Sequence, residues 1–345
     1  MTVEAPAAPD IFARYRDRID AALREAVAGP DLQLYTMVRY HLGWVDEAGK
    51  PARASQGKAL RPTLCLLMCE ALGGDQDSAL PAAAGLELLH NFSLIHDDVM
   101  DDDRTRHHRP TVWTIWGKPQ AINAGDLLNV LATLSVLRSA HPEGDIRPTL
   151  DAVKILAHGC AHMTEGQHLD LAFESRRDVS VAGYVQMVEG KSAALFAAAF
   201  EIGAVFAGND LTRRDQCRAY GQALGTAFQI RDDVLGIWGD PKQTGKPVGS
   251  DIAKRKKSLP IVHALAQANN NDRSRLREML ADTSLQPDAA AATEILDRAG
   301  SREFAEAEAD RFAAAAERHL SELDVSAWGR AALRRLAAFV TGRQH

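Results

Sequence analysis

The chain has 345 residues and a formal net charge of −6, and 46% of its residues are hydrophobic, which is the composition of a soluble protein with ample material for a core. The mild acidic balance argues against nucleic-acid binding, and the one basic run, 254–257, is too isolated for a binding face. We expect a cytoplasmic protein without a secretory signal or a transmembrane segment, because the longest apolar stretch, 193–207, falls short of the roughly 20 residues that cross a bilayer.

The first 72 residues predict three helices. Two lie within 9–45, separated by a Gly-Pro pair, and an apolar helix opens at 57–62. Lys58 and Arg61 are three residues apart at its start, where unpaired backbone N–H groups and the helix dipole favour an anion. The alternative is an ordinary exposed helix start. The four cysteines, which fit reduced core thiols better than a metal site, are Cys65, Cys69, Cys160 and Cys217.

An acidic segment follows the next apolar helix, Leu86 to Ile95. Five carboxylates fall within the seven residues 97–103, and such a cluster repels itself unless cations bind it. On a helix, Asp97 and Asp101 would lie one turn apart on the same face. Two oxygen ligands at that spacing suit Mg²⁺, which keeps several waters and borrows phosphate oxygens from a substrate. The alternative is a solvated helix end, although acidic residues favour the opposite end of a helix.

The middle of the chain predicts a basic loop, 105–110, that contains Arg106 and His107. Apolar periodicity then predicts helices over 121–137, 145–173 and 181–207. Lys191 lies within the apolar residues of the last of these helices. Its ammonium group either reaches solvent along the helix surface or meets a buried anion.

A second apolar helix, 211–238, also runs into paired aspartates, Asp232 and Asp233. A loop rich in Gly and Pro follows, with Lys246 inside it and Lys256 just beyond it. The rest of the chain predicts amphipathic helices joined by a polar loop around 269–272. No linker or repeat divides the sequence, so we expect one all-α domain over 1–345.

Together, the two acidic helix ends predict a diphosphate-binding site. If their helices run side by side, the carboxylates face each other across a cavity, and Mg²⁺ ions between them could hold a diphosphate. The same helices are apolar below this polar mouth, which suits an isoprenoid tail. The cations that would balance the remaining charge are Lys58, Arg61, Arg106, Lys191, Lys246 and Lys256.

These motifs resemble those of the trans-isoprenyl diphosphate synthases (polyprenyl synthetases), most closely the short-chain geranylgeranyl diphosphate synthases, over residues 57–265. Gly57 to Pro62 looks like the family's Gly-Lys-x-x-Arg-Pro, and Asp97 to Asp101 looks like its first Asp-Asp-x-x-Asp. The remaining matches are Lys191-Ser192 with its Lys-Thr pair, 228–233 with the start of its second aspartate motif, and 245–260 with its closing Gly-Lys…Asp…Lys…Leu-Pro segment.

The resemblance implies the isoprenoid synthase fold, a single large helical bundle around a central cavity, usually as a homodimer. It implies a prenyltransferase that joins isopentenyl diphosphate to an allylic diphosphate (geranyl or farnesyl) by Mg²⁺-assisted ionisation. The implied cofactor is Mg²⁺, as three ions bound together with the diphosphate. The implied metal-site residues are Asp97, Asp98, Asp101, Asp232 and Asp233, with Asp97, Asp101 and Asp232 as the direct ligands.

The resemblance also implies which residues bind each substrate. Isopentenyl diphosphate would be held by Lys58, Arg61 and His90. The allylic diphosphate would be held by Arg106, Lys191, Lys246 and Lys256. Gln229 and the Lys191–Ser192 backbone would stabilise the allylic cation, so the catalytic set comprises Lys191, Gln229 and Arg106.

Two positions depart from the family pattern. The usual arginine pair after the first motif is Arg106-His107 here, so His107 would bind isopentenyl diphosphate weakly or in a pH-dependent way. The third aspartate of the second motif is replaced by Gly236. Because Asp232 is retained, we expect an active enzyme with weaker metal affinity.

The product length is expected to depend on Phe92, five residues before Asp97, which on a helix would point down into the cavity. An aromatic residue there resembles the short-chain pattern, and the small Ser93 leaves room, which favours the C20 product geranylgeranyl diphosphate over C15. Ordinary core packing of Phe92 is the alternative. Two other functions stay open: a terpene synthase (a lyase) on the same fold, and a non-catalytic subunit of a heteromeric synthase.

Overall fold

The computed structural model describes residues 8–52, 57–141, 143–176, 178–208, 210–240, 249–281 and 286–342. Within these ranges the protein is α-helical apart from one hairpin of two short strands and an isolated bridge between Val45 and Pro51. The predicted all-α class is therefore confirmed. No helix in the described ranges combines the length and the apolar character needed to cross a membrane.

The chain divides into two compact units. The first comprises Met1–His158, Ala198–Cys217 and Asp324–Leu336, and the second comprises Gly159–Ala197, Arg218–Leu323 and Ala337–His345. The expectation of one domain over 1–345 stays a prediction.

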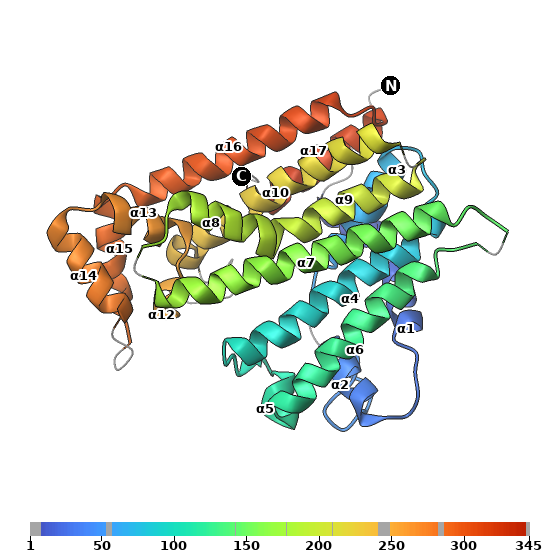
Figure 1. Cartoon of the computed structure of the whole chain (residues 1–345), viewed down its shortest axis with the longest axis horizontal. Helices are drawn as coiled ribbons and strands as arrows, with labels where there is room; N and C mark the ends of the chain where they lie inside the picture. Colours follow the sequence, from blue (N-terminus) through green and yellow to red (C-terminus); the bar gives the residue numbers. More distant parts are fainter. Residues whose placement is uncertain are drawn as a thin grey trace. The chain divides into compact units, whose positions relative to one another are not determined.

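The first unit is built around α4 (Gln76–Met100), which packs against α1 (Ala8–Ala26), α3 (Leu60–Ala71) and α6 (Lys118–Leu137) (Figure 1). Its other elements are α2 (Gln33–His41), β1 (Thr105–Arg106), β2 (Arg109–Pro110) and α5 (Val112–Trp116). The α4 helix begins ten residues before the predicted Leu86, because the Asp75 carboxylate caps it by accepting from the backbone N–H groups of Asp77 and Ser78. Gly85 lets α4 approach α6 closely, since a Cβ atom there would lie 2.8 Å from the Ala132 carbonyl oxygen.

The second unit surrounds α13 (Leu259–Gln267), which packs against α8 (Val181–Val188), α14 (Asn270–Ala281), α15 (Ala289–Arg298) and α16 (Ser301–Glu322). Buried Leu259 and Val262 of α13 belong to one apolar cluster, and buried Ile261 and Ala264 belong to another. The α12 helix (Ser250–Ala253) lies in this unit. Four helices contribute residues to both units: α7 (Arg147–Ser175), α9 (Ala194–Phe206), α10 (Leu211–Trp238) and α17 (Ala327–Val340).

Two predicted elements differ from the structure. The helix expected over 181–207 is interrupted by a π-helical turn, η1 (Glu189–Ala193), between α8 and α9. The polar loop expected around 269–272 is mostly helix, because the Asn269 side chain accepts from the Asp272 N–H at 3.0 Å and α14 begins directly after Asn269.

Candidate active site

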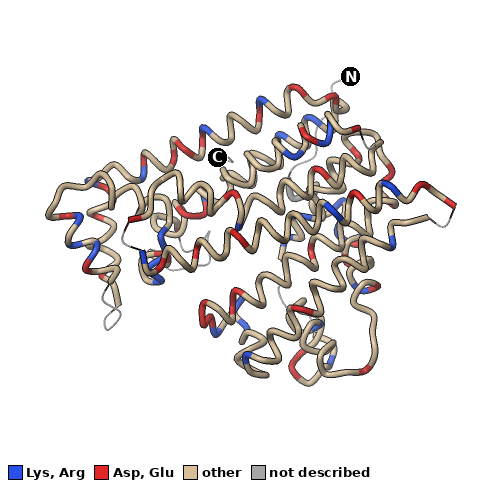
Figure 2. The backbone as a smooth tube through the Cα atoms, in the orientation of Figure 1, with Lys and Arg blue, Asp and Glu red and all other residues tan. Residues whose placement is uncertain are grey.

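The first acidic cluster lies at the C-terminal end of α4, where Figure 2 shows acidic residues gathered. The Asp101 N–H donates to the Asp97 carbonyl at 2.8 Å, a helical bond that continues α4 to its C-cap. The two side chains are therefore one turn apart, as predicted. Asp97 is half-buried and Asp101 is exposed, so solvent or a ligand can reach both carboxylates.

Asp98, between them, is only 2% exposed and pairs with Arg106. The guanidinium group donates to Asp98 Oδ1 through Nε at 2.9 Å, and its Nη2 lies 2.8 Å from the same oxygen. The second oxygen is buried and has no hydrogen-bond partner in the described part of the chain. Burial raises the pKa of Asp98, and Arg106 opposes that shift. Asp98 therefore anchors the strand that carries Arg106.

The predicted loop 105–110 is instead a β-hairpin in which Arg106 pairs with Arg109. Its two turn residues, His107 and His108, have φ values of 50° and 62°, the left-handed conformation that a type I′ hairpin turn requires at both positions. Arg109 donates to the carbonyl oxygens of Tyr40 and Val45, both at 3.1 Å, and its guanidinium group lies 4.0 Å from the centre of the Tyr40 ring. The hairpin is thereby held against the end of α2.

The first unit also contains a cluster of partly buried basic groups around α4. Burial lowers the pKa of Arg61 to about 10, although Glu87 opposes the shift, so the guanidinium group stays charged at neutral pH. Burial and the charge of Arg61 hold the pKa of His90 well below its usual value. Burial and Arg106 lower the pKa of His41 to about 3. Both imidazoles are therefore neutral at pH 7, and Lys58 lies exposed just before α3.

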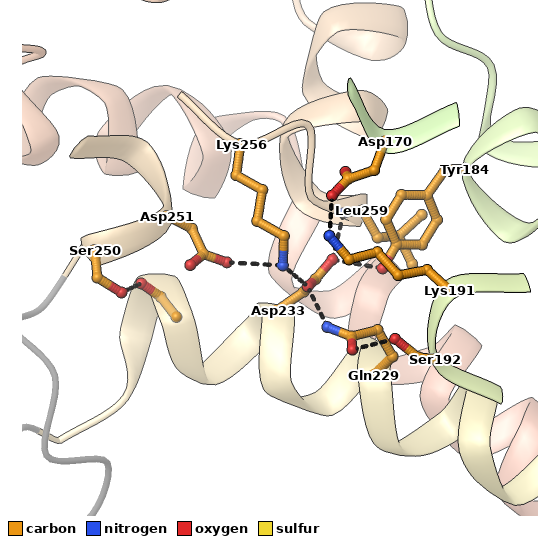
Figure 3. A network of polar contacts seen from close by, with 11 residues as sticks. Asp170, Tyr184, Lys191, Ser192, Gln229, Asp233, Ser250, Asp251, Lys256 and Leu259 are labelled. Atoms are coloured by element: carbon orange, nitrogen blue, oxygen red, sulfur yellow. Dashed lines mark hydrogen bonds and ion pairs between the residues drawn. The ribbon is translucent and has the colours of Figure 1, made fainter. Parts of the chain in front are cut away.

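Asp233 in the second unit is fully buried and accepts four hydrogen bonds, as Figure 3 shows. Oδ2 accepts from the Tyr184 hydroxyl at 2.5 Å and from the Leu259 N–H at 3.0 Å. Oδ1 accepts from Lys256 Nζ and Gln229 Nε2, both at 3.1 Å. A carboxylate with both oxygens used in this way has little capacity left for a metal. This geometry fits the expectation that Asp232, rather than Asp233, is the direct ligand of the second pair, which stays a prediction.

The two aspartate pairs thus share one arrangement. In each pair the second residue is buried and bonded to a cation from later in the chain, Asp98 to Arg106 and Asp233 to Lys256. The first residue, Asp97 or Asp232, is half-buried. Asp98 and Asp233 thus pair with cations in this structure, and the metal site of Asp97, Asp98, Asp101, Asp232 and Asp233, with Asp97, Asp101 and Asp232 as direct ligands, stays a prediction.

Lys191 and Ser192 lie on the π-helical turn η1, a feature that is frequent at functional sites. The turn touches α7 through glycine: a Cβ atom on Gly166 would lie 2.0 Å from the Lys191 backbone nitrogen. This close approach lets Lys191 Nζ reach Asp170 Oδ2 at 2.5 Å. Lys191 therefore meets an anion, which decides between the two predicted alternatives.

Gln229 joins this turn to the buried Asp233. Its Oε1 accepts from the Ser192 hydroxyl at 2.6 Å while its Nε2 donates to Asp233. Burial lowers the pKa of the Lys256 ammonium group, but the nearby carboxylates, with Asp233 and Asp251 foremost, outweigh this effect, so that the pKa is raised overall. A small pocket here is lined by Asp170, Tyr184, Met187, Val188, Lys191, Ser192, Gln229, Asp233 and Lys256. Lys246 lies outside the described residues.

The acidic pairs fit Mg²⁺ by the chemistry of their ligands. Within the described ranges, no three His, Cys, Asp or Glu side chains form a ready-made metal cage. Asp97 and Asp101 offer hard carboxylate oxygens one turn apart, which leaves coordination positions for waters and phosphate oxygens. Such pairs suit a Mg²⁺ ion that shares its ligands with a bound diphosphate.

Comparison with known proteins identifies the family. The polyprenyl synthetase family model matches residues 43–296. This chain belongs to the polyprenyl synthetase family. The (2E,6E)-farnesyl diphosphate synthase of Mycobacterium tuberculosis (strain H37Rv) is 40% identical over 331 residues, which cover 94% of this chain and 90% of that protein. The geranylgeranyl diphosphate synthase of Saccharolobus solfataricus is 35% identical over 332 residues, 95% of this chain and 99% of that protein.

The crystal structure of a polyprenyl synthetase from Streptomyces coelicolor A3(2) superposes with a TM-score of 0.89 at 38% identity, covering 96% of this chain and 99% of that one. The isoprenoid synthase fold is therefore confirmed. This polyprenyl synthetase is a prenyltransferase, a short-chain trans-prenyl diphosphate synthase. Prenyl synthases use isopentenyl diphosphate and allylic diphosphates, and the family is generally Mg²⁺-dependent.

Several site residues escaped the sequence analysis. Asp170 lies near the end of a predicted helix and Asp251 is the Asp of the closing Gly-Lys…Asp…Lys…Leu-Pro segment, but nothing in the local pattern marked either of them as the partner of a lysine. Tyr184, Glu87 and His41 look like ordinary helix residues in the sequence. Only their contacts with Asp233, Arg61 and Asn91, respectively, reveal their places.

Proposed function

We propose that this prenyltransferase joins isopentenyl diphosphate to farnesyl diphosphate and releases geranylgeranyl diphosphate. The observation that supports this product is the setting of Phe92 on α4. Its ring lies 4.7 Å from the His96 ring in an edge-to-face arrangement. His96 Nε2 is 3.2 Å from the Ile122 carbonyl oxygen, and the ring packs on Gly125, where a Cβ atom would lie only 2.3 Å from it.

These contacts favour one position of the Phe92 ring, as a floor that limits chain growth requires. Ser93, next to it, is small, and its hydroxyl donates to the His90 carbonyl oxygen at 2.8 Å. An aromatic side chain followed by a small one supports a C20 product rather than a C15 product. Relatives named as farnesyl and as geranylgeranyl diphosphate synthases both match the chain, so the assignment depends on this floor.

In the proposed mechanism, Arg106, Lys191 and Lys256 bind the allylic diphosphate, and Lys246 joins them. Their positive charges stabilise the leaving diphosphate as the allylic C–O bond breaks. Mg²⁺, held by Asp97, Asp101 and Asp232, supplies further charge neutralisation when bound, in the proposed form of three ions. Gln229, whose amide is oriented by Ser192 and Asp233, and the Lys191–Ser192 backbone place negative dipoles near the allylic cation.

Isopentenyl diphosphate is proposed to bind Lys58, Arg61 and His90, with His107 in the place of the family's second arginine. The neutral state of His90 makes it a hydrogen-bond partner rather than a charge. The double bond of this substrate attacks the cation, and the proton that leaves passes to the released diphosphate.

We also propose a cytoplasmic homodimer. The exposed face of α6 carries an apolar stripe at helical spacing, formed by Ile122, Val130, Leu134 and Leu137. Exposed apolar stripes of this kind mark interfaces, and a second copy of the chain fits the habit of the family. The four cysteines are free thiols, which supports a reducing compartment.

The test is an incubation of the purified protein with Mg²⁺, isopentenyl diphosphate and farnesyl diphosphate, followed by dephosphorylation and sizing of the products. The expected product is a C20 alcohol. An alcohol longer than C20 would refute the proposed product, and hydrocarbon formed without isopentenyl diphosphate would point to a terpene synthase. Absence of turnover with every allylic diphosphate would support the role of a non-catalytic subunit.

A further inference from the structure

The chain makes a left-handed turn at Ala59, between Lys58 and Arg61. Ala59 has φ and ψ values of 48° and 47°, a conformation that residues with a Cβ atom rarely adopt. It is only 7% exposed and directly precedes α3, so Lys58 lies before the turn and Arg61 lies in the first turn of the helix. The direction of Lys58 therefore depends on how this turn is held.

Hydrogen bonds hold the turn on both sides. After it, the Ala59 carbonyl oxygen accepts from the N–H and the hydroxyl of the buried Thr63, at 3.2 Å and 2.9 Å. Before it, the Gly57 carbonyl oxygen accepts from Nη1 of Arg16 at 2.9 Å. Arg16 belongs to α1 and lies 41 residues earlier in the chain. A separate helix therefore fixes the segment that carries Lys58, as an unfavourable backbone conformation requires of its surroundings.

Arg16 is itself oriented for this contact. Its Nε lies 3.2 Å from Asp20 Oδ2, an ion pair one turn along α1. The guanidinium group has its donors in a fixed plane, so this pair leaves Nη1 directed at the Gly57 carbonyl oxygen. Burial raises the pKa of Glu87, and the charges of Arg61, foremost, and of Arg16 oppose that shift. Arg16 therefore lies near the carboxylate that also faces Arg61.

We propose that Arg16 is a positioning residue for isopentenyl diphosphate: by holding the Gly57 carbonyl oxygen, it keeps Lys58 directed toward the bound diphosphate. This proposal rests on the proposed function, and it extends the site to α1, which supplied none of the residues predicted from the sequence. Because the hydrogen bond forms without substrate, the segment is ordered before binding, which lowers the entropy cost of binding. The alternative is that Arg16 only attaches α1 to the rest of its unit.

Arg18, on the same helix, provides the matched control for this alternative. It attaches α1 to the start of α4 by donating to Gln76 Oε1 at 2.8 Å and by pairing with Asp77. These contacts lie at the start of α4 and not at the turn. Arg16→Ala and Arg18→Ala each remove one attachment of α1, so both should lower the thermal midpoint by similar amounts. Only Arg16→Ala should weaken the binding of isopentenyl diphosphate.

The test measures the affinity for isopentenyl diphosphate by calorimetry, without an allylic diphosphate, so that no turnover occurs. Arg16→Ala should lose about tenfold in affinity, since a hydrogen bond from a charged donor no longer holds the segment. In steady-state kinetics its KM for isopentenyl diphosphate should rise while its KM for farnesyl diphosphate stays unchanged. Arg18→Ala should change none of these values. Equal losses of affinity in the two variants, or no loss in Arg16→Ala, would overturn the proposal.

A double variant tests whether Arg16 acts through Lys58. Lys58→Ala removes the residue that is positioned, so adding Arg16→Ala to it should cause no further loss of affinity. Losses that add would show that the guanidinium group acts on the diphosphate directly, and would overturn the positioning role. If the unchanged protein binds no isopentenyl diphosphate, the proposed function fails and this proposal fails with it. Binding by the unchanged protein that survives Arg16→Ala refutes the positioning role alone.

Discussion

At the scale of single residues, neighbouring aspartates have separate tasks. Asp98 and Asp233 are buried and bonded to Arg106 and Lys256, whereas Asp97 remains accessible one turn from Asp101. Removing a buried charge leaves its partner uncompensated, but removing an accessible carboxylate leaves packing intact. Substitutions within one pair should therefore affect different properties.

Asp98→Asn is expected to lower the free energy of unfolding by about 2 kcal/mol, because the partly buried Arg106 loses its anion. Urea unfolding followed by circular dichroism measures this loss. Asp97→Asn is the matched control, since it should leave stability unchanged and weaken Mg²⁺-dependent pyrophosphate binding instead. Equal losses of stability in both variants would contradict the division of tasks.

Phe92→Ala is expected to lengthen the product beyond C20, because the ring that limits the chain is removed. Sizing of the dephosphorylated alcohols by mass spectrometry measures the change. Ser93→Ala, which changes little volume, is the control and should keep the C20 product. An unchanged product from Phe92→Ala would show that the ring is ordinary core packing.

The sequence predicted which residues are acidic or basic near the site, but not how they pair. Adjacent aspartates are visible in the chain, whereas the buried member of each pair is defined by a cation 8 or 23 residues later. Tyr184 lies 49 residues from Asp233, and no local pattern marks it. The pairing of the buried aspartates with Arg106 and Lys256 therefore could not be predicted from the sequence.

At the scale of elements, the π-helical turn depends on contact between backbones. Gly166 of α7 and Gly190 of η1 lie so close that a Cβ atom on Gly190 would be 2.7 Å from the His162 carbonyl oxygen. Helical periodicity over 181–207 could not predict this interruption, because its cause lies on another helix. The hairpin was missed for a similar reason, since two histidines stand where Asn-Gly would have marked the turn.

Gly166→Ala is expected to displace η1, because the new methyl group would meet the Lys191 backbone, which cannot rotate away. We expect a loss of about 1–3 kcal/mol in the free energy of unfolding and a weaker affinity for pyrophosphate with Mg²⁺. Thermal unfolding and calorimetry measure the two effects. Gly183→Ala on α8 is the control, because the nearest atom to a Cβ atom at position 183 would be the Ser180 hydroxyl oxygen, 3.3 Å away. Similar losses in both variants would count against the special role of the crossing.

At the scale of the whole molecule, stability should depend on pH through two partly buried histidines. Burial lowers the pKa of His41 to about 3, and the pKa of His90 shifts in the same direction. The unfolded chain binds protons near pH 6.5 while the folded protein does not, so stability is full above that pH and falls as the pH drops toward 3. Burial raises the pKa of Glu87, so this side chain contributes stability that increases as the pH falls from its raised pKa to its ordinary pKa. This contribution opposes that of the histidines.

The expected slope is up to about 1.4 kcal/mol per pH unit for each histidine. Urea unfolding at several pH values between 7.5 and 5.5 measures it. His41→Asn should flatten the slope, and because Glu87 is present in both proteins, its contribution cancels from the comparison. A slope that stays the same in His41→Asn would exclude His41 as a source. The groups facing His41 are Arg106, Arg109, His107 and Asn91.

The proposed dimer makes a separate prediction for the whole molecule. Val130→Lys together with Leu134→Lys places two charges in the exposed stripe of α6, so the dimer should dissociate into monomers. Sedimentation velocity or light scattering measures the mass in solution. Glu322→Lys on α16 is the control and should remain dimeric. A dimer that survives both lysines would place the interface elsewhere.

The carboxylate of Asp233 also provides a spectroscopic reporter. It accepts the N–H of Leu259, the first residue of α13, at 3.0 Å. The chemical shift of that one amide proton reflects the charge and direction of the same carboxylate that holds Lys256. Nuclear magnetic resonance of the Leu259 amide can therefore follow substrate binding, because this amide bonds to the other oxygen of the carboxylate that holds Lys256. The reporter is a backbone N–H group that needs no contact with the substrate.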